Sequence, residues 1–255
     1  MMSDFVDSAI EFRNVSFHFL ISTEGRIATF KEWVIRRATG GPSRFHRTIA
    51  LEGVSFKVAK GRALGVIGHN GAGKSTLLRI AGGILQPQEG LAVVRGRVAP
   101  IIELGLGFEQ ELTGRENIIF NGALLGRSRD EMESRMAEIA DFAELGGFLD
   151  QPIRTYSTGM VARLAFSVAT TVDATVLLLD EVLSVGDERF QRKCADRMAD
   201  FRKKGVSILF VSHALASVEE LCDEVIWMDS GRIRCYGEAT EVVDAYRTWA
   251  AEISN

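Results

Sequence analysis

Short runs of consecutive apolar residues recur along this chain, and most are followed by a segment with helical spacing. Three such runs lie at residues 63–67, 175–179 and 206–211, and β-branched residues are frequent in them. Runs of this length and composition are typical of strands that are covered on both faces. Because helical patterns separate these strands, the sequence predicts an α/β core with a parallel sheet.

The two ends of the chain show alternating patterns instead. Residues 9–19 predict an edge strand, and residues 49–58 predict its antiparallel companion. Residues 91–102 read as two further strands. Near the C-terminus, residues 225–236 predict a hairpin that turns at Ser230-Gly231. The N-terminal strands therefore differ in kind from the buried runs of the parallel core.

A mostly helical block interrupts this order. Helices are predicted at residues 113–125 and 128–145, and Ser128 with Glu131 has the spacing of a capping box at the start of the second helix. The absence of a strand pattern between them sets this part of the chain apart. We therefore predict a helical subdomain over residues 107–158.

Residues 20–48 separate the first two predicted strands and are rich in arginine. Within this insertion, helical spacing is followed by Phe30, Trp33, Val34 and Arg37. This spacing predicts a basic amphipathic helix. Such a helix could pack its apolar stripe on the rest of the domain or could face a membrane surface, and the pattern favours neither alternative.

Composition narrows the class of protein. Charged residues make up 25% and hydrophobic residues 46%, as in an ordinary globular domain, and the net charge is -4. This sign of charge argues against broad nucleic-acid binding. The three cysteines, Cys194, Cys222 and Cys235, form no Cys-x-x-Cys pair, which is typical of reduced thiols. Since no apolar run approaches the roughly 20 residues that span a bilayer, we do not expect the chain to cross a membrane, although it could dock on one.

The strongest candidate for chemistry is the segment that follows the apolar run at 63–67. It reads Gly68-His69-Asn70-Gly71-Ala72-Gly73-Lys74-Ser75-Thr76, a glycine, four residues and then Gly-Lys-Ser. The glycines let successive backbone N–H groups point at one anion, and the helix that begins here adds the positive end of its dipole. Lys74 would then reach the β- and γ-phosphates of a nucleotide, and the Ser75 hydroxyl would ligate Mg²⁺. An ordinary glycine-rich turn is the alternative, which the strand-loop-helix context disfavours.

A second candidate is the pair of carboxylates Asp180-Glu181 at the end of the apolar run 175–179. Asp180 would hold Mg²⁺ directly or through water. Glu181 would orient and polarise the water that attacks the γ-phosphate. Acidic residues also begin ordinary loops after strands, but a phosphate loop upstream favours the functional interpretation.

A third motif, Tyr156-Ser157-Thr158-Gly159-Met160, comes just before a predicted helix, and Ser157 could simply be its N-cap. Taken in order, however, the phosphate loop, the helical block, this motif, Asp180-Glu181 and Val211-Ser212-His213 resemble the ATP-binding subunit of an ABC transporter. The resemblance covers the chain from residue 9 to about residue 237. It implies a single α/β ABC ATPase domain over residues 1–255, with a parallel-sheet P-loop core, an antiparallel β subdomain and a helical subdomain.

The resemblance also implies roles for Phe19, Asp187 and His213. Phe19 resembles the aromatic residue that stacks on adenine, although it could be a core residue of its strand. Asp187 resembles a loop aspartate that communicates across a dimer, and its alternative is a helix N-cap. His213 resembles the switch histidine that contacts the γ-phosphate, where the alternative is a structural histidine at a strand end. No role is assigned to the other histidines, His18, His46 and His69.

Two departures from the usual family pattern narrow the branch. The signature Leu-Ser-Gly-Gly-Gln reads Tyr-Ser-Thr-Gly-Met here, which keeps the Ser157 hydroxyl and the Gly159 backbone N–H for a γ-phosphate held by the opposite subunit. At the glutamine-loop position, counting back from Leu-Thr-Gly-Arg-Glu-Asn places Glu103, with Gln110 as the alternative. Glu103 would bring a full negative charge to Mg²⁺ or the attacking water. These variants resemble the branch that exports O-antigen polysaccharide, capsule or teichoic acid.

This branch implies the cofactors, partners and location. The protein would use ATP and Mg²⁺ and would form an ATP-sandwich homodimer with a second copy of itself. It would bind an integral membrane permease and sit as a peripheral protein on the cytoplasmic face of the inner membrane. Membrane contact is expected through the permease, with the 20–48 insertion as a second candidate, and no nucleic-acid partner is expected. The expected cargo is a lipid-linked polysaccharide.

Three rival functions share the phosphate loop. One is an ABC ATPase for a small lipid, drug or nutrient, which the variant motifs disfavour. Another is a P-loop small-molecule kinase, which has no need of Ser157, Gly159 or His213 at these spacings. The last is an ABC protein of DNA repair or translation, which usually has paired cassettes or a long coiled coil, and neither pattern is found in this sequence.

Overall fold

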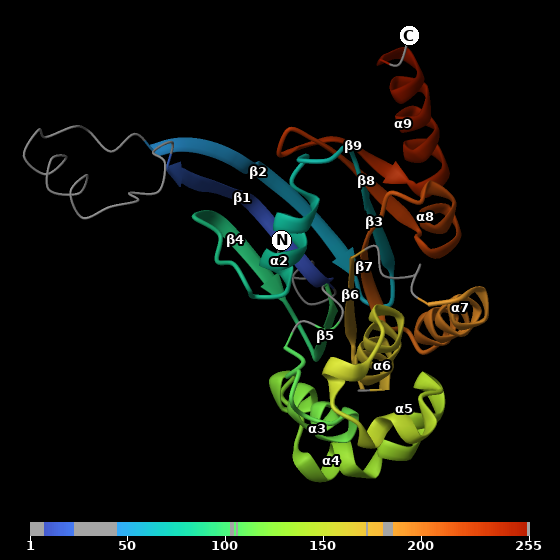
Figure 1. Cartoon of the computed structure of the whole chain (residues 1–255). Coiled ribbons are helices and arrows are strands. Elements are labelled where there is room, and N and C mark those ends of the chain that lie inside the picture. The colour runs from blue at the N-terminus through green and yellow to red at the C-terminus, as the bar shows by residue number, and fades with distance from the viewer. Residues whose placement is uncertain are drawn as a thin grey trace, which may run out of the picture.

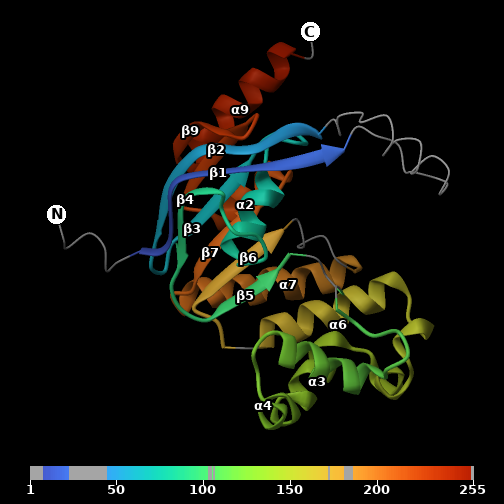
Figure 2. The same cartoon turned by 90° about the vertical axis from the view of Figure 1, so that its left-hand side faces the viewer.

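The computed structural model describes most of the chain, namely residues 8–22, 45–102, 105, 107–171, 173–180 and 186–253. These residues form two β-sheets and a set of helices (Figures 1 and 2). The helices that lie between β5 and β6 in the chain gather at one end of the molecule, and the C-terminal helix lies at the opposite end (Figure 1).

The larger sheet has six strands in the order β5-β6-β7-β3-β8-β9. Their bounds are β3 Ala63–Ile67, β5 Val98–Ile101, β6 Val176–Asp180, β7 Ser207–Val211, β8 Glu224–Asp229 and β9 Arg232–Glu238. Neighbouring strands from β5 to β8 pair in parallel, and β9 pairs with β8 as an antiparallel hairpin. Every residue of β3 and β7 is buried, as their largely apolar sequences predict. The predicted parallel α/β core and C-terminal hairpin are confirmed.

Parallel pairing brings three strand ends to one edge of this sheet. β3 lies beside β7 with Val66 opposite Val211, and β7 lies beside β6 with Val211 opposite Asp180. The carboxyl ends of these three strands therefore lie at the same edge of the sheet. In open α/β sheets, ligands bind outside the carboxyl ends of the strands.

The smaller sheet has the order β2-β1-β4 and is antiparallel, with bounds β1 Ser8–Ser22, β2 Phe45–Ala59 and β4 Glu89–Val94. The predicted pairing of the first two strands is confirmed, but the prediction that the first is an edge strand is wrong. β4 pairs with the other edge of β1, which makes β1 the central strand. The predicted 20–48 insertion overlaps both strands, because β1 extends to Ser22 and β2 begins at Phe45. The amphipathic helix predicted within the insertion lies outside the described residues.

One helix, α2 (Lys74–Ala81), lies between the two sheets. An apolar cluster joins Phe12 and Val54 of the smaller sheet, Leu77 and Leu78 of α2, and Leu209 of the larger sheet. This packing places the first turn of α2 against both sheets. A second apolar cluster covers the other face of the larger sheet and includes α7 (Glu188–Lys203), α8 (Leu215–Leu221) and α9 (Ala239–Ile253).

The helical block is built from more pieces than the sequence predicts. It contains α3 Gly114–Leu124, α4 Arg129–Ser134, α5 Met136–Ala143, two 3₁₀ helices at Gly146–Asp150 and Ile153–Thr155, and then α6 Thr158–Thr171. The prediction of one helix over residues 128–145 is wrong, because the chain bends at Arg135. Met132 of α4 is fully buried and packs so closely on α3 that a Cβ on Gly122 would collide with it. α5 packs on α6 instead, so the two halves turn toward different partners.

Caps at the helix starts are local and follow the sequence more closely. The Ser128 hydroxyl accepts a hydrogen bond from the Glu131 backbone N–H at 3.2 Å, which is the N-cap half of the predicted capping box. A complete capping box forms instead at Thr113 and Glu116, before α3. In the part of the chain that the structure describes, no helix combines the length and apolarity that crossing a bilayer requires.

Candidate functional site

A cavity of about 670 Å³ opens at the carboxyl edge of β3, β6 and β7. The loop after β3 contributes Asn70, Gly71, Gly73, Lys74, Ser75 and Thr76 to its walls. Three further predicted residues, Phe19, Asp180 and His213, line the same cavity. The structure therefore brings together residues that lie up to 194 positions apart in the chain (213 minus 19).

Glycines give the loop after β3 its shape. Gly68, Gly71 and Gly73 all have positive φ angles, of 147°, 82° and 104°. A Cβ on Gly68 would collide with the carbonyl oxygen of Met228, and a Cβ on Gly73 would collide with that of Ala50. The loop is thus held against β8 on one side and β2 on the other, at distances that only a bare backbone permits.

Lys74 places its charge inside this loop. Its side chain is buried with 6% exposure, and its ammonium group donates to the carbonyl oxygens of Gly68 at 2.7 Å and His69 at 2.9 Å. No side chain caps the N-terminus of α2, which begins at this lysine. Uncapped N–H groups at a helix start, together with a cation, form a site suited to phosphate.

Asp180 and His213 come from neighbouring strand ends. Asp180 is the last residue of β6, and its register partner Val211 ends β7. Ser212 is buried, and its hydroxyl accepts a hydrogen bond from the Ala214 backbone N–H at 3.0 Å. This bond bridges the turn that carries the exposed His213 side chain to the cavity. Sequence reasoning quoted Ser212 only as part of a motif and missed this supporting role.

Phe19 lies on the β1 side of the cavity. The side chain is 39% exposed and meets Phe17 edge-on, with ring centroids 5.0 Å apart. This exposure does not fit the alternative that Phe19 is a core residue. Its register partner Thr48 and the adjacent Ile49 on β2 also line the cavity. Sequence reasoning missed these β2 residues, and only the register across the 20–48 segment could have found them.

The oxygen donors in this cavity suit a divalent cation. Ser75 offers a hydroxyl and Asp180 a carboxylate, the hard ligands that Mg²⁺ takes together with substrate phosphates and water. Among the described residues, no three His, Cys, Asp or Glu side chains gather as a metal cluster. A magnesium ion shared with a nucleotide does not require one.

Outside the phosphate loop, the predicted residues Ser157, Gly159 and Asp187 do not line this cavity. The Ser157 hydroxyl accepts from the Met160 backbone N–H at 3.2 Å, and Asp187 Oδ1 accepts from the Phe190 backbone N–H at 2.9 Å. Both side chains therefore cap helices, which was the alternative interpretation of each residue. Ser157 is exposed, and the space around Gly159 is open, with only the Ser157 hydroxyl within 4 Å of a Cβ placed there.

The remaining predicted residues differ in whether the structure describes them. Glu103 and Glu181 lie outside the described residues. Gln110, the alternative to Glu103, is exposed and does not line the cavity. Its backbone carbonyl accepts a hydrogen bond from the Arg154 N–H at 3.0 Å. Gly68 and Ala72 shape the loop from behind, where Ala72 is fully buried.

A family model described as "ABC transporter" matches residues 51–184. This chain belongs to the ABC transporter family. The match begins in β2 and spans the phosphate loop, the helical block and Asp180. As the motifs predict, the chain is an ABC-type ATPase domain that binds nucleotide.

Relatives of this ABC ATPase include curated export proteins. The "O-antigen export system ATP-binding protein RfbB" of Klebsiella pneumoniae is 51% identical over 199 residues, 78% of this chain and 81% of the relative. The "Teichoic acids export ATP-binding protein TagH" of Lactiplantibacillus plantarum is 44% identical over 203 residues, 80% of this chain and 56% of the relative. These matches confirm the predicted resemblance to the polysaccharide-exporter branch.

Solved structures confirm the fold class. A dimeric structure of the ATP-binding cassette MJ0796 bound to ADP and Pi superimposes with a TM-score of 0.71. The match covers 90% of this ABC ATPase and 98% of that chain, at 19% sequence identity. At this identity the likeness shows the fold alone.

Proposed function

We propose that this protein is the ATP-hydrolysing subunit of an exporter that moves a lipid-linked polysaccharide, such as O-antigen, across the cytoplasmic membrane. One observation carries the proposal: the phosphate loop, Asp180, His213 and Phe19 line one cavity in a chain that is 51% identical to an O-antigen export ATP-binding protein. A small lipid, drug or nutrient is the alternative cargo. The named relatives in both O-antigen and teichoic acid export favour a polysaccharide.

The cavity provides a place for each part of ATP. The loop from Gly68 to Thr76 would hold the phosphates, with Lys74 stabilising the charge that develops on the transferring phosphoryl group. Phe19, exposed at the cavity wall, would stack on the adenine. The long β1–β2 pairing supports this role, because it places Phe19 in the same cavity as the phosphate loop.

Ser75 and Asp180 would hold Mg²⁺, with Glu103 as a third candidate. When bound, the ion would neutralise charge on the β- and γ-phosphates. Glu181, next to Asp180 in the chain, would orient and polarise the attacking water. His213 would contact the γ-phosphate and help to keep the nucleotide-bound state closed.

Ser157, Gly159 and Asp187 would act across a homodimer. The Ser157 hydroxyl is exposed and lies outside the cavity of its own chain, as expected for a group that completes a second copy's site. The Gly159 backbone N–H has open space around it and would approach the γ-phosphate held by that copy. Two ATP molecules would then lie between two chains.

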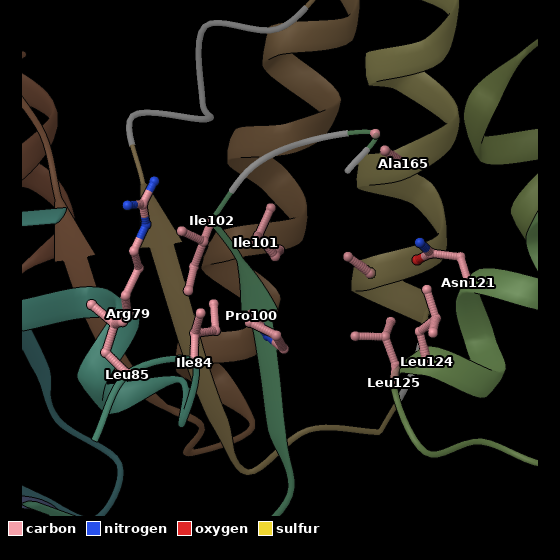
Figure 3. Close-up of a pocket in the computed structure, with 12 residues that line it drawn as sticks. Arg79, Ile84, Leu85, Pro100, Ile101, Ile102, Asn121, Leu124, Leu125 and Ala165 are labelled. Carbon is pink, nitrogen blue, oxygen red and sulfur yellow. The ribbon is translucent and has the colours of Figure 1, made fainter. Parts of the chain in front are cut away.

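A second, apolar cavity of about 340 Å³ would receive the membrane partner (Figure 3). It lies between β5 and the helical block, where Pro100 and Ile101 face Leu124 of α3 and Ala165 of α6. The Leu124 side chain is 61% exposed. Gly105, which also lines this cavity, is two residues from Glu103 in the chain. A permease segment bound here would therefore be coupled to the nucleotide site. The protein would then work as a peripheral subunit on the cytoplasmic face of the membrane.

Replacement of the proposed water-activating residue tests the chemical step. In Glu181→Gln, we expect ATP turnover by the purified protein to fall roughly 10²–10⁴-fold, because the general base is lost, while ATP binding persists. Phosphate release and equilibrium nucleotide binding measure the two effects. Glu188→Gln, an exposed residue in the first turn of α7, is the matched control. A wild-type turnover rate in Glu181→Gln would remove that residue from its role.

A charged residue in the apolar cavity tests the partner and the cargo. We expect Leu124→Glu to keep ATP turnover and to lose surface polysaccharide in cells that depend on this protein, since the permease contact is broken. Leu91→Glu is the control, because Leu91 is also exposed, at 49%, but lies on β4. Normal surface polysaccharide in cells that lack the protein altogether would point to a different cargo.

A further inference from the structure

The imidazole ring of His69, inside the phosphate loop, lies between two hydrogen-bond acceptors. Nδ1 is 2.7 Å from the backbone carbonyl oxygen of Asn70, and Nε2 is 3.1 Å from Oδ1 of Asp229 at the end of β8. Neither acceptor can donate a proton, because one is a carbonyl oxygen and the other a carboxylate. Both bonds therefore require an N–H on each ring nitrogen. A neutral imidazole has one such N–H, and the imidazolium has two.

The Asp229 carboxylate is itself held in place by three donors. Besides His69, Oδ1 accepts from the Ser230 hydroxyl at 3.0 Å, and Oδ2 accepts from Nη1 of Arg234 at 3.1 Å. The hydrogen bond from His69, followed by that from Ser230, lowers the pKa of Asp229 below its usual value. The carboxylate thus stays charged and acts as a fixed anchor for the ring.

Arg234 is in turn held by aromatic side chains. Its guanidinium lies 4.4 Å from the ring centre of Trp227 on β8 and 5.1 Å from that of Trp249 on α9. Stacking of this kind limits the movement of the guanidinium and keeps its direction toward Asp229. The anchor of the His69 ring therefore rests on the C-terminal hairpin and helix.

Backbone contacts join the same hairpin to the same loop. The Gly231 N–H donates to the Ala72 carbonyl oxygen at 3.0 Å, and Gly68 packs directly against the Met228 carbonyl. These two contacts secure the ends of the loop segment between them. The His69 ring secures its middle, through the carbonyl oxygen of Asn70.

We propose that His69 is a positioning residue for nucleotide binding, because its ring joins the Asn70 carbonyl to Asp229 of the β8–β9 hairpin. This proposal rests on the proposed nucleotide role of the same loop. A fixed Asn70 peptide preorganises the N–H groups that follow it, which lowers the cost of ordering them around an anion. Loss of the ring would release the Asn70 carbonyl from the hairpin.

The expected effect is on nucleotide affinity rather than on turnover. Because the His69 side chain is 40% exposed, water competes for its hydrogen bonds, and we expect the KM for ATP to rise only roughly three- to tenfold when the ring is removed. The kcat should be unchanged by His69 itself, because the ring is not among the residues that line the cavity.

Variants at His69 and Asp229 test the proposal. His69→Ala removes both hydrogen bonds and should have the raised KM. His69→Arg keeps N–H donors for both acceptors, so its KM should stay near that of the wild type. Asp229→Asn weakens the anchor of the ring, and its KM should rise toward that of His69→Ala. Thermal unfolding of each variant checks the fold, and Ser55→Ala, on the far part of β2, serves as a surface control.

A spectroscopic measurement follows the ring itself. The ¹⁵N-labelled histidine signal of His69, assigned by its loss in His69→Ala, should shift in Asp229→Asn, because the ring loses its partner at Nε2. An unchanged His69 signal in Asp229→Asn overturns the proposal.

The kinetic outcomes separate this proposal from the function on which it rests. Equal KM values in the wild type and His69→Ala overturn the role of His69 and leave the ATPase assignment standing. A KM that is raised in His69→Ala and that His69→Arg does not restore shows a packing role only, and also overturns it. Failure of the wild type itself to bind ATP would overturn the proposed function.

Discussion

The phosphate-loop edge of the sheet and the helical block are held together in different ways. The loop lies on buried strands, and its glycines touch the backbone of β2 and β8. The helical block joins α7 through apolar side chains, since Phe142 and Phe166 pack on Phe190. Charged side chains add to this junction, where the Glu144 carboxylate accepts from Lys193 of α7 at 2.9 Å. Glycine contacts with backbone fix the first region, whereas apolar and charged side chains fix the second.

This difference teaches how one chain can carry two parts of a site with unlike demands. The phosphate cradle needs backbone groups held to fractions of an ångström, and close packing supplies that precision. The exposed Ser157 and the neighbouring Gly159, which we propose to act on a second copy's nucleotide, lie at the start of α6 in the helical block. This part of the site is therefore positioned by side-chain packing, not by the glycine contacts that fix the phosphate loop.

The largest expected effect comes from filling the glycine contact of the loop. Gly68→Ala places a Cβ against the Met228 carbonyl, and we expect the free energy of unfolding to fall by about 2–4 kcal/mol, with ATP binding lost. Gly71→Ala, where the φ is 82° but nothing lies within 4 Å, should cost about 1–2 kcal/mol. Urea unfolding measures both. Equal losses would show that strain, and not packing, fixes the loop.

A smaller effect is expected at the junction of the helical block. Glu144→Gln removes the charge that Lys193 and Arg163 share, and we expect the free energy of unfolding to fall by about 1 kcal/mol. Hydrogen exchange should quicken in α5 and α6 while β3 and α2 keep their protection. Glu133→Gln, which breaks an exposed pair with Arg129, is the control. Faster exchange in β3 would mean that the two regions are not independent.

The smallest effect is expected in the smaller sheet, where a buried carboxylate, that of Glu11, is held by charged partners. Glu11 is 1% exposed, and the hydrogen bond from Arg13 is the largest cause that lowers its pKa to about 2. The ionised form is favoured by folding, so its stabilisation is complete above the usual pKa of 4.5 and is lost as the pH falls toward 2. The stability difference between wild type and Glu11→Gln should shrink over that range in urea titrations. A difference that stays constant would contradict the prediction.

Local patterns accounted for much of the phosphate loop and the core. The strand at residues 63–67, the glycine spacing after it and the start of α2 are set within about 20 consecutive residues, so the sequence predicts them together. The break at Arg135 could not be predicted in the same way. It follows from Met132 packing on Gly122, a contact between two helices whose positions no local pattern specifies.

The order of strands within a sheet was the second feature that the sequence did not predict. The first strand alternates like an edge strand, but it lies between β2 and β4, because β4 pairs with its second edge. The cavity wall at Phe19 and Thr48 depends on a register that spans the 20–48 segment. His69 and Asp229 meet from positions 160 residues apart, and neither belongs to a motif that indicates the other.

The sequence by itself determined that this protein has a phosphate-binding loop and an alternating α/β core, and its motifs identified the ABC family. It could do so because these features arise from consecutive residues, whose backbone angles and burial follow from residue type. Only the tertiary structure decided which side chains share the cavity, where β1 stands in its sheet and what holds His69. Those contacts depend on strand order and on packing between distant segments, which the spacing of apolar residues along the sequence does not specify.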